Sequence, residues 1–170
     1  MRKIILFLMV VFNMVFSANV FAAQAAAEIK GTAADSQISG KVEFEDVAEG
    51  LKVKARVYNA PAGKHGFHVH ETGSCADGGK AAGGHFNPDG VNHGLLAKDG
   101  FAHAHAGDMG NIEVASDGTG QLEMVLPQMS LNGKYNVIGR SVILHEKEDD
   151  FGQPTGNAGS RIGCGVIQGA

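Results

Sequence analysis

The chain has 170 residues, with 14 Lys and Arg against 18 Asp and Glu, and a formal net charge of −4. This length suits a single domain with a buried core. The acidic surplus argues against nucleic acid or an anionic membrane surface as a partner.

The first 22 residues have the composition of a secretory signal peptide. Arg2 and Lys3 precede an apolar run over 4–12, and the stretch 20–23 (VFAA) offers small residues to a peptidase. The apolar run is too short to span a bilayer as a helix. We therefore predict that residues 1–22 are cleaved, and that 23–170 form one exported domain that does not enter a membrane. Cleavage removes two basic residues and no acidic one, so the mature chain is more acidic still.

Short alternating segments with glycine-rich turns dominate the rest of the chain and predict an all-β fold. In 51–58 (LKVKARVY), for example, apolar and charged residues alternate. Two long segments, 72–108 and 146–160, interrupt the strand pattern, and long ordered loops in a compact domain are usually functional. The strands are expected over 38–44, 51–58, 112–115, 122–126, 142–144 and 162–167, with one more through the stretch HGFHVHE at 65–71. A β-sandwich or barrel follows.

Two cysteines are present, Cys75 and Cys164. Export places them in an oxidising compartment, so an intrachain disulfide is expected.

All eight histidines lie between residues 65 and 145, which points to metal binding. His68 and His70 alternate along a strand, so both can reach one ion. His105 and Asp108 are three residues apart across a turn and can also bind together. Spacing alone leaves open how many sites exist, which ion each holds, and whether the pair His103 and His105 replaces His68 and His70. Further candidates are His85, His93 and His145.

Six motifs, in order HGFHVHE, GGHFNP, NHG, HAGDMGN, GRSVILHEKEDD and GNAGSRIGCGVI, closely resemble those of exported bacterial copper–zinc superoxide dismutases. The resemblance implies an immunoglobulin-like Greek-key β-sandwich, or flattened barrel, of about eight antiparallel strands with two long functional loops; these dismutases are known members of the sandwich class. It also implies conversion of superoxide to dioxygen and hydrogen peroxide in the periplasm, which protects that compartment from oxidative damage, with one copper and one zinc per subunit and possible homodimers.

The resemblance assigns a role to each matched residue. His85 bridges the two metals and accepts a proton in catalysis, Arg161 attracts the anion beside copper, and Asp149 hydrogen-bonds ligands of both metals. His65 supports the copper strand, and His103 is an exposed extra. Lys80 is a candidate for steering superoxide to the site. The implied copper ligands are His68, His70, His85 and His145; the implied zinc ligands are His85, His93, His105 and Asp108; the matched disulfide joins Cys75 and Cys164.

Three other functions compete with this prediction. An exported copper or zinc carrier needs neither Asp149 nor Arg161, and Cu(I) carriers favour clustered Met and Cys, which the mature chain lacks. A structural or adhesive sandwich does not explain seven matched ligands. A zinc hydrolase would need a glutamate or other water-activating group beside the histidines, and no usual motif of that kind is present.

Overall fold

The structure is a computed structural model that describes residues 22–170. The predicted signal peptide falls almost wholly outside the described residues, so its cleavage stays a prediction. Within 22–170, no helix is long and apolar enough to cross a membrane. The strands are β1 (Gln24–Gly31), β2 (Ser39–Val47), β3 (Gly50–Tyr58), β4 (Gly63–His70), β5 (Asp108–Val114), β6 (Gly120–Pro127), β7 (Ser141–His145), β8 (Arg161–Val166) and β9 (Gln168–Gly169); one 3-10 turn, η1 (Lys80–Ala82), and one short helix, α1 (Leu96–Asp99), lie between β4 and β5.

Eight antiparallel strands close into a barrel in the order β2-β3-β6-β5-β4-β7-β8-β1, with β1 pairing back to β2 and β9 added beside β1. The closure is uneven, because only two residue pairs join β5 to β6 and two join β1 to β8. The barrel is therefore flattened into two four-stranded layers, β1-β2-β3-β6 and β5-β4-β7-β8. This confirms the predicted fold class.

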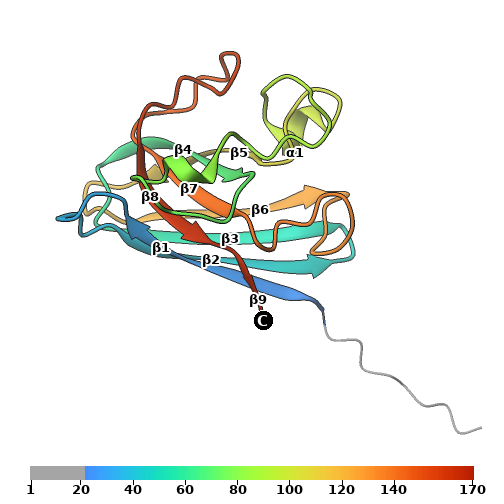
Figure 1. Cartoon of the computed structure of the whole chain (residues 1–170), viewed down its shortest axis with the longest axis horizontal. Helices are drawn as coiled ribbons and strands as arrows, with labels where there is room; N and C mark the ends of the chain where they lie inside the picture. Colours follow the sequence, from blue (N-terminus) through green and yellow to red (C-terminus); the bar gives the residue numbers. More distant parts are fainter. Residues whose placement is uncertain (1–21) are drawn as a thin grey trace, which may run out of the picture.

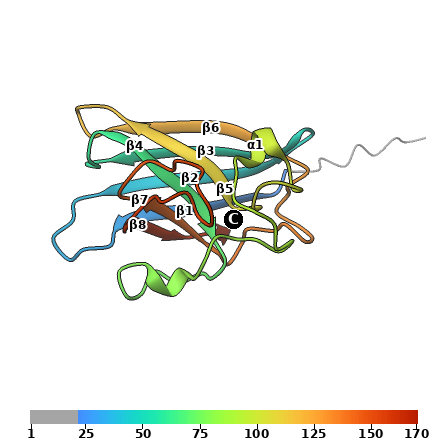
Figure 2. The same cartoon turned by 90° about the horizontal axis from the view of Figure 1, so that it is seen from above.

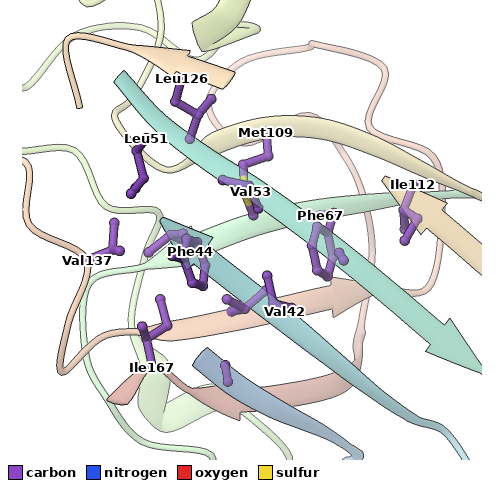
Figure 3. Packing of buried hydrophobic residues seen from close by; sticks show 14 of the residues in the cluster. Val42, Phe44, Leu51, Val53, Phe67, Met109, Ile112, Leu126, Val137 and Ile167 are labelled. Carbon is purple, nitrogen blue, oxygen red and sulfur yellow. The ribbon is translucent and has the colours of Figure 1, made fainter. Parts of the chain in front are cut away.

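Alternating apolar residues on the strands fill the space between the layers. On β3 the inward residues Leu51, Val53, Ala55 and Val57 are all buried, as their alternation predicts. Phe44 on β2 and Phe67 on β4 belong to the same cluster and enter it from opposite layers (Figure 3). Burying a large aliphatic or aromatic side chain contributes about 1.5–3 kcal/mol. The layers are held together mainly by this core.

Three features of the barrel were not predicted. Strand β1 is rich in alanine, a weak β-former, yet small inward side chains at Ala25 and Ala27 fit under the closing layer. Strand β5 begins at Asp108, four residues before the expected start. A third long connection, 128–140, joins β6 in one layer to β7 in the other, and such a crossover cannot be a tight turn. It packs on the first long loop, where Phe101 and Tyr135 stack with ring centroids 4.0 Å apart.

The outer face of β4 is the platform for the predicted site. Phe67 and Val69 point into the barrel core, so His68 and His70 point outward. The two predicted loops cover this face: the segment with α1 and the loop after β7 lie above β4 and β5 in Figure 1, and the green segment near residue 80 projects beyond β7 and β8 in Figure 2. The predicted disulfide is present and attaches the first loop to β8, with the Cα atoms of Cys75 and Cys164 5.7 Å apart.

Candidate metal centre

Four histidines converge on the outer face of the barrel and form the first ligand set: His68, His70, His85 and His145. All four are buried, and one ring nitrogen from each lies within 4.8 Å of those from the other three. β4 supplies two of them, the end of β7 supplies His145, and the first loop brings in His85. The β4–β7 pairing makes this possible, because it sets the end of β7 beside the outer face of β4.

The hydrogen bonds of these rings leave lone pairs free for a metal. His70 donates from Nδ1 to the Gly83 carbonyl at 3.0 Å, and His145 from Nδ1 to the Gly159 carbonyl at 3.3 Å. Each neutral ring therefore keeps an unprotonated Nε2, and the two Nε2 atoms face one another at 3.3 Å. Two acceptors at that distance are stable together only when a cation lies between them.

The second ligand set consists of His85, His93, His105 and Asp108, which are also buried. Oδ1 of Asp108 lies 2.8 Å from Nδ1 of His85 and 3.1 Å from Nδ1 of His105, and its Oδ2 lies 2.9 Å from Nδ1 of His93. The backbone N–H groups of Gly94 and His105 donate to Oδ2 and hold the carboxylate in place. His85 thus belongs to both sets, and three imidazoles with one carboxylate suit zinc.

Asp149 lies between the two sets without belonging to either. Its carboxylate accepts Nε2–H of His68 at 2.8 Å and Nε2–H of His93 at 2.9 Å. Nδ1 is then the ring atom left free for a metal ion: neither of these two buried nitrogens makes a hydrogen bond, and that of His93 faces Oδ2 of Asp108 at 2.9 Å. A buried polar atom without a partner is costly. The pattern fits metal ions at both sets, with Asp149 hydrogen-bonded to one ring of each set.

Burial also sets the charge of the rings. It lowers the pKa of His70 to about 2, of His145 to about 3 and of His85 to about 4, so these rings are neutral at pH 7, as metal ligands must be. Burial likewise opposes protonation of His93, but the carboxylates of Asp108 and Asp149 outweigh it and raise its pKa to about 9. The second set therefore attracts positive charge, which a metal dication supplies.

Two side chains that the sequence analysis did not assign hold the second long loop over the site. Asn111 on β5 donates from Nδ2 to the Asp149 carbonyl at 2.9 Å and accepts the Asp149 N–H at 2.7 Å. Gln153 makes the same reciprocal pair with the backbone of His93, at 2.9 and 3.0 Å. Asn111 lies inside the motif HAGDMGN, so the sequence offered a reason to consider it as a site residue. Gln153 lies in none of the six motifs, so the sequence offered no such reason for it.

The remaining candidates lie beside the ligand sets. Arg161 begins β8, is paired in register with His145, and donates from its guanidinium to the carbonyls of Gly79 and Gly83. His65 is buried, with its ring between the carbonyls of Pro61 and His145 at 2.8 and 2.9 Å, and so ties β4 to the end of β7.

Two polar candidates lie outside both sets. His103 is exposed, so the pair of His103 and His105 does not replace the one on β4. Lys80 is exposed on η1, next to the Gly79 carbonyl that Arg161 binds.

A β-barrel with two buried ligand sets that share one histidine defines a protein built for two adjacent metal ions. A family model described as "Copper/zinc superoxide dismutase (SODC)" matches residues 38–167, and the chain belongs to that family. Membership confirms the predicted class of enzyme, an oxidoreductase that acts on superoxide, and its predicted copper and zinc.

Individual relatives agree with this assignment. The chain is 42% identical over 139 residues to "Extracellular superoxide dismutase [Cu-Zn]" of Caenorhabditis elegans, covering 78% of this chain and 62% of that protein. It is 41% identical over 143 residues to "Superoxide dismutase [Cu-Zn] A" of Xenopus laevis, covering 79% and 92%. A solved structure, the "clock protein EA4", superposes with a TM-score of 0.77 at 34% identity and covers 91% of this chain and 99% of that one.

Proposed function

We propose that the first ligand set binds copper and the second binds zinc, with His85 bridging the two, and that this chain converts superoxide to dioxygen and hydrogen peroxide. The observation that carries the proposal is His85, which takes part in both sets and whose Nδ1 is directed at Asp108. All-imidazole donors suit copper, and a carboxylate among three imidazoles suits zinc. Bound copper supplies the one-electron redox step that superoxide needs, and zinc supplies none.

The protein contributes protons, charge and fixed geometry. Nδ1 of His85 is committed to the second set, so its Nε2 is the atom that can take up a proton and release it to the reduced substrate. Burial lowers the pKa of this ring to about 4 in the absence of metal, so the ring is neutral and free to act as a ligand at neutral pH. Asp149 holds the rings of His68 and His93 in one tautomer through the cycle, since it cannot accept from both unless each keeps its Nε2–H.

Arg161 is the group that attracts superoxide in this proposal. Its two hydrogen bonds to loop carbonyls hold the cation beside His145, where an anion would approach. Lys80 extends the positive charge outward on η1 and is proposed to steer the anion. The acidic net charge does not prevent this, because local charge in a recess outweighs distant charge. For Lys80→Ala, kcat/KM should fall less steeply with ionic strength than in the unmodified protein; an unchanged slope would remove Lys80 from the steering role.

We further propose that residues 1–22 are a signal peptide, that 23–170 form the single mature domain, and that the mature enzyme protects the periplasm. Three observations support export: the composition of the leader, the Cys75–Cys164 disulfide, and the word "extracellular" in the names of the relatives from C. elegans and Drosophila melanogaster. Mass spectrometry of protein released by osmotic shock should give a chain beginning near residue 23. Recovery of the intact leader in the cytosol would contradict it.

The decisive experiment is the metal content and activity of one purified sample, with His145→Ala as the variant. The unmodified protein should hold one copper and one zinc per chain and dismutate superoxide rapidly. His145→Ala should lose copper and activity while keeping zinc, since His145 belongs to the first set only. Metals without activity would favour the carrier function, and full activity in His145→Ala would refute the ligand assignment.

A further inference from the structure

The peptide between Gly83 and Gly84 is a junction at the edge of the first ligand set. The Gly83 carbonyl accepts two hydrogen bonds, one from Nδ1 of His70 at 3.0 Å and one from the guanidinium of Arg161. The same carbonyl therefore sets the tautomer of a proposed copper ligand and the direction of the cation that attracts substrate. Any rotation of this peptide plane would disturb both groups together.

Glu71 holds that peptide from its other side. Its Oε1 accepts the Gly84 N–H at 3.0 Å. Gly83 has φ of 74° and ψ of −152°, a conformation that glycine alone adopts readily. A Cβ at Gly83 would lie 2.4 Å from Oε1 of Glu71, so a glycine is also needed for the close approach of the carboxylate.

The backbone of Glu71 is anchored independently of its side chain. Its N–H donates to the Gly84 carbonyl at 3.0 Å, and its carbonyl accepts Nη1 of Arg140 at 2.8 Å. Arg140 is itself fixed over the ring of Phe86, 3.5 Å from the centroid. The Glu71 carboxylate is therefore presented to the Gly84 N–H from a rigid base.

The negative charge of Glu71 is unfavourable for an enzyme of an anionic substrate. The carboxylate is exposed, and it binds the N–H of the same peptide group whose carbonyl accepts from Arg161. A negative group there lowers the local concentration of superoxide. The hydrogen bond from the Gly84 N–H to the Glu71 carboxylate is the contact that can offset this unfavourable charge.

We propose that Glu71 is a positioning residue for this reaction: by holding the Gly83–Gly84 peptide, it fixes Arg161 for binding the anion and His70 for binding copper. The inference rests on the proposed ligand assignment. It makes a specific distinction, because the acceptor atom of Glu71 should help anion binding while its charge should oppose it.

The experiment separates acceptor from charge with two variants of the copper- and zinc-loaded protein. Glu71→Gln keeps an acceptor oxygen and removes the charge, whereas Glu71→Ala removes both. Azide, a small anion, is titrated against the visible absorbance of copper. Loss of one hydrogen bond should weaken azide binding about two- to tenfold in Glu71→Ala relative to Glu71→Gln. Their kcat/KM values should differ in the same direction, with equal dependence on ionic strength.

A second measurement reports on His70 without catalysis. In zinc-loaded, copper-free protein, the His70 Nδ1–H should exchange with solvent faster in Glu71→Ala than in Glu71→Gln. If Glu71→Ala does not fold, Glu71→Asp keeps the charge and withdraws the oxygen, and it should bind azide more weakly than the unmodified protein.

Equal azide affinity and equal exchange in the Ala and Gln variants would overturn the role of Glu71. An unmodified protein that binds no copper or lacks dismutase activity would instead overturn the proposed function.

Discussion

Asp149→Asn tests whether one carboxylate orients ligands in both sets. Oδ2 accepts from His68 at 2.8 Å, and both oxygens lie within 3.0 Å of Nε2 of His93. An amide has one acceptor oxygen, and its NH2 group would face the N–H of the other ring. A hydrogen bond to a charged acceptor contributes about 1.5–3 kcal/mol, so at least one metal affinity should fall about ten- to hundredfold.

The assay is competition for copper and for zinc with chromophoric chelators, metal by metal. Asp150→Asn is the matched control, because Asp150 is exposed and its carboxylate contacts Gly152 and Asn157 but no histidine. The control should leave both affinities unchanged. If Asp149→Asn also binds both metals within twofold of the unmodified protein, the orienting role of Asp149 is refuted.

Two further predictions concern the loop over Asp149 and the metal-free rings. At Gly156, φ is 77° and a Cβ would lie 1.8 Å from Oδ1 of Asp149, so Gly156→Ala should weaken zinc binding about tenfold. Gly133→Ala has similar backbone strain with no atom within 4 Å, and a zinc affinity that fell equally in both variants would exclude the clash as the cause. In metal-free protein, stability should be greatest near the ordinary histidine pKa of 6.5. Below it, the unfolded chain binds protons that three buried rings refuse, and above it the stabilising proton on His93 is lost as pH rises through about 9. The three rings are His70, His85 and His145. The measurement is the urea concentration at the midpoint of unfolding, at several pH values between 4.5 and 9. A midpoint that increases as the pH is lowered below 5.5 would contradict the prediction.

Local pattern was enough to predict most strands, whereas the proposed ligand sets came from the resemblance to the family. Alternation in 51–58 predicted which side chains of β3 are buried, because a strand sends successive residues to opposite faces. The same alternation placed His68 and His70 on one face. Alanine-rich β1 escaped prediction because its pairing depends on its neighbours in the barrel and hardly on its own propensity.

Residue spacing alone could not group the proposed ligands; the family resemblance implied the two groups, and the fold brings their members together. Spacing left His103 and His105 as an alternative pair, and the turns of the first loop leave His103 exposed while His105 is buried at Asp108. Asn111 and Gln153 act through reciprocal hydrogen bonds to backbone groups on other segments, and these partners cannot be read from the sequence around either residue. Such contacts depend on how two loops meet over the barrel.

The sequence alone therefore specified the types of donor residue, their number, and the motifs whose resemblance to the family implies copper and zinc. Convergence came from the barrel: pairing of β4 with β7 and the disulfide to β8 bring nitrogens separated by up to 77 positions, from His68 to His145, within 4.8 Å of one another. Metal binding needs donor atoms within a few ångströms of a point. For residues so far apart in sequence, strand register and loop packing determine the distances between the donor atoms.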